Sequence, residues 1–274
     1  SVGTLGDVDG DGVADFAVGW DNTGLLSGSV YVFFMNTDGT VRSSTFIPQV
    51  SVAPLPSSFG TAVIGIGDYN RDGTPDMAVG ARNDVIYGLQ GEIPTPTGAV
   101  YVLFLNSTGS PIPNDGQAAN NGLIKQIMPS PFSQFGSSIA QMTNNVLAVG
   151  APAATGLGIG PLQSSVSNGS VFFIGLQGNG SVVATFSVEL GGSQGNGPPL
   201  SRSYEFGSAV ADIGDVTGDG IKDIAVGAPG AEGTGHVYLI ALTSSYAMKS
   251  YSRVSPRDIS GVDGSEWGAG LAAG

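Results

Sequence analysis

The chain has 274 residues, a net charge of −13, 45 glycines, 16 prolines, one histidine and no cysteine. The lack of cysteine excludes disulfides, thiolate nucleophiles and zinc–thiolate sites. The acidic excess has the wrong sign for binding a phosphate backbone, so we expect no nucleic-acid partner. No run approaches 18 apolar residues and no signal-peptide pattern is visible, so the sequence predicts no membrane insertion.

Apolar residues occur in short runs instead of following a helical period. The runs are four or five residues long, rich in β-branched and aromatic side chains, and bounded by Gly, Asn, Ser or Pro, which is typical of buried strands. In chain order they are Val30–Phe34, Val100–Phe104, Val171–Ile174 and Val237–Ile240. The sequence therefore predicts an all-β fold.

The same sequence elements recur along the chain in a fixed order. An aromatic-Gly pair opens the unit, an Ala-Val-Gly strand follows, and Gly-x-Val-Tyr/Phe comes near the end. The aromatic-Gly pairs are Phe59-Gly60, Phe135-Gly136, Phe206-Gly207 and Trp267-Gly268, and the Ala-Val-Gly strands are 16–19, 77–80, 147–150 and 224–227. Successive pairs are far enough apart for four strands plus loops, so each unit is predicted to be one four-stranded antiparallel blade of a β-propeller.

We divide residues 1–274 into blade units at about 1–58, 59–134, 135–205 and 206–266. Residues 267–274 are either a closing strand or the start of a further blade. In the first case the two ends complete one blade and close a four-bladed ring, which we slightly favour because closure removes exposed strand edges. In the second case the chain is part of a longer array.

The order Phe-Gly, Gly-Asp-rich loop, Ala-Val-Gly-Ala-Pro (148–152 and 225–229) and Gly-x-Val-Tyr resembles the FG-GAP repeat of integrin α-subunit propellers. The resemblance covers nearly the whole chain in four units. It implies a β-propeller in which the first strand of each blade lies near the central axis. Integrin propellers have seven blades, so the resemblance leaves ring closure open.

Three of the four units have an acidic loop between their first and second strands, with the spacing D-x-D/N/T-x-D-G-x-x-D. Ca²⁺ takes about six to eight oxygen ligands, and alternate residues of a tight loop turn inward. Side chains at positions 1, 3, 5 and 9 and the carbonyl at position 7 are the predicted ligands. They are Asp7, Asp9, Asp11, Val13 and Asp15; Asp68, Asn70, Asp72, Thr74 and Asp76; and Asp215, Thr217, Asp219, Ile221 and Asp223.

The alternative interpretation of each loop is a metal-free hairpin turn, because Asp and Gly are also common turn residues. Three such loops at one place in a repeat favour calcium, since ten crowded carboxylates repel one another unless a cation neutralises them. We therefore predict three Ca²⁺ sites, and prefer Ca²⁺ to Mg²⁺ because Mg²⁺ demands strict octahedral geometry. The first loop has the most carboxylates and should bind most tightly. The third unit has only the short turn 141–146, and its blade should be metal-free.

In an up-and-down blade all 1–2 turns lie on one face, so the predicted calcium sites share a face. The long, weakly charged loops 82–97 and 151–168 would lie on the opposite face. We expect a protein or glycan ligand there, as the integrin resemblance also implies. The alternative is that these loops only cover the tops of the blades.

A catalytic triad would need the only histidine, His236, which lies in a strand pattern without a nucleophile motif, so we expect no enzyme activity. Trp20 and Trp267 are expected to pack between blades. The sequence predicts a calcium-binding, extracellular or cell-surface module with a structural or adhesive role. The alternatives are a non-catalytic accessory module of a secreted enzyme and a building block of a surface fibre, which would self-assemble through the chain ends. N-glycosylation patterns begin at Asn106, Asn168 and Asn179 and fit a secreted glycoprotein.

Overall fold

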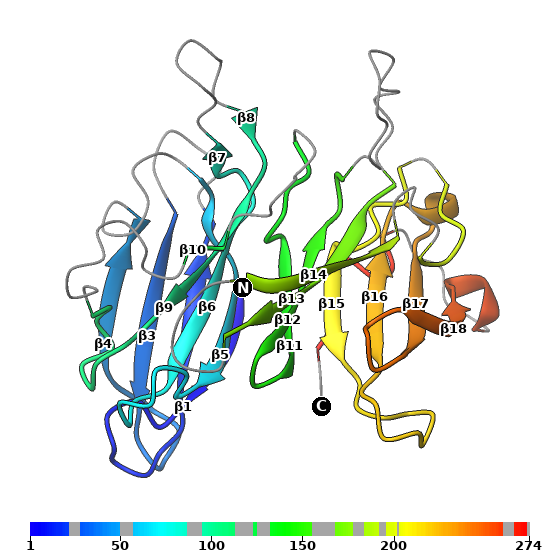
Figure 1. The fold of residues 1–274 in the computed structure, drawn as a ribbon. Helices are drawn as coiled ribbons and strands as arrows, with labels where there is room; N and C mark the ends of the chain where they lie inside the picture. The colour runs from blue at the N-terminus through cyan, green and yellow to red at the C-terminus, as the bar shows by residue number, and fades with distance from the viewer. Residues whose placement is uncertain are drawn as a thin grey trace.

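The computed structural model describes residues 1–21, 28–49, 57–86, 95–112, 123–124, 132–154, 168–177, 184–191, 196–201, 203–259 and 266–272. These residues confirm the all-β prediction, because they form four separate four-stranded antiparallel sheets (Figure 1). Among the described residues, two short 3₁₀ helices accompany the strands, η2 (Ala231–Gly233) and η3 (Pro256–Asp258). No helix in the described part of the chain has the length and apolar character needed to cross a bilayer.

Each sheet is one blade, and its strands follow one another from the inner to the outer edge. Blade 1 contains β1 (Val2–Gly6), β2 (Asp15–Trp20), β3 (Ser29–Met35) and β4 (Val41–Pro48). Blade 2 contains β5 (Phe59–Gly67), β6 (Asp76–Ala81), β9 (Ala99–Leu103) and β10 (Leu123–Ile124). Blade 3 contains β11 (Ser138–Thr143), β12 (Val146–Ala151), β13 (Ser170–Leu176) and β14 (Ala184–Gly191). Blade 4 contains β15 (Ala209–Asp212), β16 (Ile224–Ala228), β17 (His236–Leu242) and β18 (Met248–Val254).

Three apolar cores lie between consecutive blades. A strand turns alternate side chains to opposite faces, so Val30 and Val32 of β3 pack toward blade 2. From the other side, Tyr101 and Leu103 of β9 enter the same core. Equivalent cores join blade 2 to blade 3 and blade 3 to blade 4. Consecutive blades are thus held together by burial of apolar side chains.

The aromatic-Gly pairs form a tight turn at the entrance to blades 2, 3 and 4. The glycine has a positive φ, for example +96° at Gly207, and a Cβ there would lie 2.5 Å from the carbonyl oxygen of Ser170 in the preceding blade. The residue before each aromatic also has a positive φ although it is not glycine, namely Ser58, Gln134, Glu205 and Glu266. Glycine is required because the backbones of two blades meet at this point.

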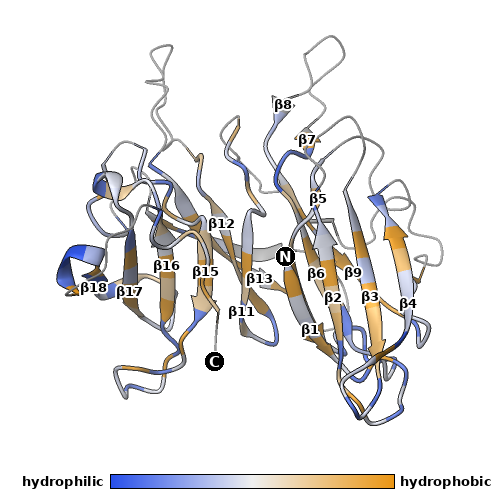
Figure 2. Cartoon of the chain, turned by 180° about the vertical axis from the view of Figure 1, so that it is seen from behind, coloured by the Kyte–Doolittle hydropathy of each residue, from blue (hydrophilic) through white to orange (hydrophobic). Residues whose placement is uncertain are grey.

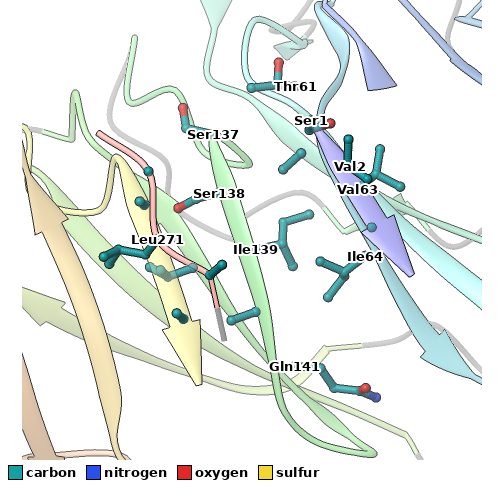
Figure 3. A pocket seen from close by; sticks show the side chains of 18 of the residues that line it. Ser1, Val2, Thr61, Val63, Ile64, Ser137, Ser138, Ile139, Gln141 and Leu271 are labelled. Atoms are coloured by element: carbon teal, nitrogen blue, oxygen red, sulfur yellow. The ribbon is translucent and has the colours of Figure 1, made fainter. Parts of the chain in front are cut away.

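The described loops lie at two opposite ends of the blades. This agrees with the prediction that the acidic loops share one face and the long loops lie on the other. The acidic 1–2 loops lie at the lower end in Figure 1, and the β7–β8 hairpin (Val85–Ile86 and Thr95–Pro96) lies at the upper end. Residues 87–94 and 155–167, which include most of the two long loops, lie outside the described residues. The first strands of all four blades, together with residues 269–272, line a central hollow of about 740 Å³ (Figure 3).

The structure does not join blade 4 to blade 1. Trp267 forms an isolated parallel bridge with Gly235 of blade 4, as Phe206 does with Gly169 of blade 3. The described C-terminal residues therefore take the position in which a following blade would begin, while β1 pairs only with β2 in the described sheet. Ring closure stays a prediction.

Trp20 corrects one expectation. Its side chain was expected to pack between blades, but it is 58% exposed at the end of β2. The physical reason is that Trp20 lies on the face of blade 1 that has no neighbouring blade in the structure.

Candidate metal centres

The three acidic loops occupy equivalent places, between β1 and β2, β5 and β6, and β15 and β16. In blade 3, β11 ends at Thr143 and β12 begins at Val146, so only two residues connect them. The short turn predicted for this blade is confirmed. The acidic loops can therefore be compared position by position, with blade 3 as a natural reference that lacks the carboxylates.

The aspartate at position 1 folds each loop around its own side chain. Backbone N–H groups from the middle of the loop converge on its two carboxylate oxygens, so this residue sets the curvature of the loop. Asp7 accepts from Gly10, Asp11 and Gly12 at 2.7, 3.0 and 2.8 Å; Asp68 from Asp72 and Gly73 at 3.0 and 3.0 Å; Asp215 from Gly218, Asp219 and Gly220 at 2.7, 3.1 and 2.7 Å.

The aspartate at position 5 fixes the peptide at position 7. The N–H groups of Val13, Thr74 and Ile221 donate to Asp11, Asp72 and Asp219 at 2.9, 2.8 and 3.0 Å. Position 3 differs between loops: Asn70 donates to Asp72 Oδ2 at 2.8 Å, and the hydroxyl of Thr217 lies 3.5 Å from Asp215 Oδ1. The three loops therefore share one backbone fold and differ in the chemistry of position 3.

The aspartate at position 9 connects three parts of its blade. Asp15, Asp76 and Asp223 are all buried. One carboxylate oxygen of each accepts the N–H of loop position 2, and the other accepts an N–H at the end of the third strand. The second set of bonds runs from Met35 to Asp15, Leu105 to Asp76 and Leu242 to Asp223, at 3.0, 3.0 and 3.1 Å. Position 9 is thus a structural anchor as well as a predicted ligand.

The first loop brings three carboxylates together. Among the described residues, Asp7, Asp9 and Asp15 form the one acidic group whose oxygens lie within 4.8 Å of one another. Asp9 Oδ1 is buried and accepts no hydrogen bond. An orphaned carboxylate oxygen beside two other carboxylates fits a hard cation such as Ca²⁺, which takes oxygen ligands only. Asp11, which was predicted to join them, lies outside this group.

Basic side chains from the fourth strand reach two of the loops. Arg42, the second residue of β4, forms an ion pair with Asp9 and a second with Asp11 at 2.6 Å. Lys249, the second residue of β18, pairs with Asp219 at 2.7 Å. The sequence analysis missed both residues, although their shared position in the fourth strand could have been found by aligning the repeats.

Burial and hydrogen bonding shift the pKa values of the loop carboxyls in opposite directions. Burial raises the pKa of Asp15, and it raises the pKa of Asp76 to about 6 despite three backbone N–H donors. The exposed Asp215 has a lowered pKa, chiefly because it accepts the N–H of Gly220. The pKa of Asp219 is lowered first by its hydrogen bond with Lys249. A bound cation would favour the charged form of every one of these groups.

A second hollow, of about 870 Å³, lies at the opposite end of the blades, where the second strands end. Arg82 and Asp21 form an ion pair of 2.7 Å at this hollow. Its other charged or amide-bearing lining residues are Gln134, Glu205 and Glu266. The two ends of the molecule therefore differ: one carries the acidic loops, and the other carries a mixed polar hollow.

His236, the only histidine of the chain, is buried in β17. Burial lowers its pKa, and its Nε2 lies 3.7 Å from Glu232. Its ring packs edge-on against Tyr204 and Tyr238. Its Nδ1 has no hydrogen-bond partner in the described part of the chain.

Comparisons with known proteins support the repeat assignment. Residues 5–79 match the FG-GAP-like repeat, and residues 206–240 match the FG-GAP repeat. Integrin alpha-PS2 of Drosophila melanogaster is 42% identical over 83 residues, which is 28% of this chain and 6% of that protein. Human integrin alpha-6 is 42% identical over 82 residues, 28% of this chain and 7% of that protein. Phosphatidylinositol-glycan-specific phospholipase D of Bos taurus is 28% identical over 212 residues, 73% of this chain and 22% of that protein.

Proposed function

We propose that this chain, which carries FG-GAP repeats in integrin-like β-propeller blades, is a calcium-binding module with a structural and adhesive role. The observation that carries the proposal is the first acidic loop, where three carboxylates converge and one buried oxygen has no hydrogen-bond partner. The second and third loops have the same backbone fold around their position 1 aspartates. Three Ca²⁺ ions would be held by the side chains at positions 1, 3, 5 and 9 and the carbonyl at position 7.

The role of the ion would be mainly structural. Each loop joins the first two strands of its blade, and its position 9 aspartate also holds the third strand. A cation would neutralise the mutual repulsion of the loop carboxylates and so stabilise all three strands together. Several protein oxygens around one ion leave little room for a substrate, which supports a module without catalysis of its own.

Calcium titration tests this proposal directly. Binding to the folded state alone should raise the free energy of unfolding by about 2.7 kcal/mol when free calcium is 100 times its Kd. Isothermal titration should give three sites, and differential scanning calorimetry should give a higher Tm in calcium than in excess chelator. Mg²⁺ is the matched control ion. An unchanged Tm after chelation would refute the structural role.

We further propose that a protein or glycan ligand binds at the end opposite the calcium loops. The support is the polar hollow there, with the Arg82–Asp21 ion pair at its edge and the β7–β8 hairpin at the same end. Surface screening against glycan and extracellular-protein arrays tests it, with Arg82→Ala as the variant and Arg42→Ala, at the other end, as the control. An extracellular or cell-surface location fits this role, because millimolar calcium would fill weak loop sites there. Mass analysis at Asn106 and Asn168 of the protein secreted from eukaryotic cells tests the glycoprotein prediction.

An accessory module of a secreted enzyme is the second candidate. The similarity to the phospholipase D over 73% of this chain favours it. A catalytic domain encoded in the same full-length gene would support this candidate. If the full-length gene encodes no catalytic domain, the accessory role is rejected and the adhesive role is retained.

A further inference from the structure

The histidine of blade 4 lies at a position where the other blades have small side chains. His236 is the first residue of β17, and it pairs with Ala228, the last residue of β16. The residues at the same place in blades 1, 2 and 3 are Ser29, Ala99 and Ser170, which also pair with the last residue of the second strand. The imidazole is therefore specific to blade 4 and is not required by the repeat fold.

The imidazole of His236 is buried against two tyrosine rings. Its side chain is only 2% exposed. The ring packs edge-on against Tyr204, which precedes blade 4, and against Tyr238 of its own strand, with ring centroids 6.2 and 6.1 Å apart. Its Nδ1 has no hydrogen-bond partner among the described residues. A positive charge on this ring would be poorly solvated, so these surroundings favour the neutral imidazole.

Four charged side chains of the described residues act on this ring, and their charges cancel. Glu232 of η2 lies 3.7 Å from His236 Nε2, and it also pairs with Arg253 at 3.0 Å and Arg257 at 3.8 Å. Asp258 of η3 is the second carboxylate that acts on the ring. Figure 2 shows both 3₁₀ helices on the blade 4 side of the molecule, with hydrophilic residues in each. Protonation of the histidine would therefore give this cluster a net positive charge.

Protonation of His236 would oppose the packing around it. The imidazolium could donate to Glu232 only in competition with two arginines, so three cations would share one carboxylate. Burial lowers the pKa of His236 from its ordinary value of 6.5, and this effect outweighs the attraction of Glu232. As the pH falls below 6.5, an opened histidine therefore binds a proton that the packed one does not, and the packed arrangement loses stability.

The backbone of η2 is strained next to the histidine. Glu232 has φ 50° and ψ 22°, in the left-handed region that residues other than glycine rarely adopt. Such residues persist only where surrounding contacts hold them, and the ion pairs of Glu232 are contacts of this kind. A positive charge on His236 would compete for the same carboxylate and weaken those contacts. We therefore expect η2 to rearrange first.

The segment around η2 also forms part of the wall of the second hollow. The N–H of Gly230 donates to the carbonyl oxygen of Tyr204 at 3.2 Å, and an added Cβ at Gly230 would overlap the backbone of the segment that carries this tyrosine. Gly230 and Glu205 line the hollow, as does Glu266, whose segment passes close to the backbone carbonyl of His236. A rearrangement at His236 would therefore change the shape of this wall.

We propose that His236 is a pH-sensitive switch at the end of the molecule opposite the acidic loops. At neutral pH the uncharged imidazole keeps η2 packed against residues 203–206. In mildly acidic solution its protonation separates η2 from Tyr204 and reshapes the wall of the second hollow. The switch needs neither bound calcium nor a ligand in the hollow, so a failure of the calcium proposal or of the ligand proposal would leave it standing.

Proton NMR of the histidine ring tests the first half of the proposal on the intact chain, because the signals of the only histidine need no assignment. In a titration from about pH 8 to about pH 4.5, the midpoint should lie below 6.5. Glu232→Gln removes the carboxylate beside Nε2 and should shift the midpoint lower. Arg253→Gln removes a cation near the ring and should shift it higher. A wild-type midpoint of 6.5 or above, a ring that is still neutral at the end of the titration, or shifts in the opposite directions would overturn the proposal.

Hydrogen–deuterium exchange tests the second half, which is the opening of η2. After correction for the intrinsic effect of pH on exchange, residues 203–206 and 229–236 of the wild type should lose protection between about pH 7.5 and about pH 5.5. His236→Ser places at this position the residue that blades 1 and 3 contain, and it should show no such loss. Both proteins are measured at the same calcium concentration, so that competition between protons and metal at the acidic loops affects them equally.

The internal control is β12 of blade 3, the blade without an acidic loop, whose protection should stay constant over the same range. The Tm of His236→Ser at neutral pH verifies its folding, and the NMR titration of the wild type does not depend on this variant. Unchanged protection of η2 in the wild type would overturn the proposal. So would a loss of equal size in His236→Ser, or one that extends to β12, because neither would be a local effect of the histidine.

Discussion

Asp76 Oδ1 accepts a hydrogen bond of 3.0 Å from the backbone N–H of Leu105, so that a loop before the second strand of blade 2 is bonded to the end of its third strand. Blades 1 and 4 contain the same bond. In blade 3 the equivalent N–H, that of Leu176, donates instead to the carbonyl oxygen of Asn145 at 2.7 Å. The third strand thus needs an acceptor at this point in every blade, and a backbone carbonyl serves where the acidic loop is missing.

This bond predicts that Asp76→Ala destabilises the protein with or without calcium. The change would leave several buried backbone N–H groups without an acceptor, at a cost of about 3 kcal/mol. Urea unfolding in excess chelator measures this cost apart from any metal effect. The control is Asp9→Asn, which we expect to affect stability mainly in calcium. Equal stability of Asp76→Ala and the wild type in chelator would contradict the anchoring role.

The number of carboxylates predicts the order of calcium affinity. The first loop has four and should contain the tightest site, because ligand charge tunes affinity. Terbium luminescence titration of Asp9→Asn and of Asp72→Asn, in the second loop, compares two changes that each remove one negative charge. We expect Asp9→Asn to remove the tightest phase. If Asp72→Asn removes the tightest phase and Asp9→Asn does not, the second loop binds more tightly than the first and the prediction is wrong.

Arg42 is predicted to compete with calcium at the first loop. Its guanidinium pairs with Asp9 and Asp11, so a cation bound there must displace it or share those oxygens. Because Arg42 is partly exposed and such pairs are worth at most about 1 kcal/mol, Arg42→Ala should tighten calcium binding by up to about fivefold. Isothermal titration measures the change. Arg82→Ala, at the other end of the molecule, is the control, and weaker binding by Arg42→Ala would show that Arg42 supports the site.

The raised pKa of Asp76 also predicts that the free energy of unfolding depends on pH. Its pKa in the folded state is about 6, above the 3.8 expected when unfolded, because burial disfavours the charged form. Between about pH 6 and pH 4 the folded state therefore binds more protons than the unfolded state. The free energy of unfolding should rise as the pH falls through this window in chelator, by at most about 3 kcal/mol from this group.

Urea midpoints in chelator at several pH values, with Asp76→Asn as the reference, isolate this contribution. In calcium, the free energy of unfolding should instead fall as the pH falls, since protons compete with the metal for the carboxylate. If the difference in free energy of unfolding between the wild type and Asp76→Asn stays constant with pH in chelator, the pKa of Asp76 is not raised.

Adding one methyl group at the glycine of the aromatic-Gly turn is predicted to lower the stability of the protein strongly. Gly207→Ala should cost at least about 2 kcal/mol, because the positive φ is unfavourable for alanine and its Cβ would meet the carbonyl of Ser170 at 2.5 Å. Gly218→Ala is the matched control: its φ is +74° but nothing lies within 4 Å of the added carbon, so it should cost about 1 kcal/mol. Chemical unfolding compares the two, and equal costs would show that the two blades can move apart there.

Several features of the protein could be predicted from the sequence because they depend on neighbouring residues. Strand alternation, Gly-bounded runs and the spacing of Asp and Gly in a hairpin are local, and their repetition identified four blades and three equivalent loops. The short turn of blade 3 was visible for the same reason. The FG-GAP resemblance followed from these repeated elements, and the comparisons confirmed it.

Other features depend on contacts between residues far apart in the chain. Arg42 reaches Asp9 across the blade, and Leu105 bonds to Asp76 from another strand, neither of which the loop spacing encodes. Trp20 occupies the position held by the buried Ala81 in blade 2, and its exposure depends only on whether a blade packs against it. The sequence by itself determined the blades and their acidic turns, whereas the tertiary structure decided which charges meet and which apolar side chains are buried between blades, because burial depends on neighbours that the local pattern does not specify.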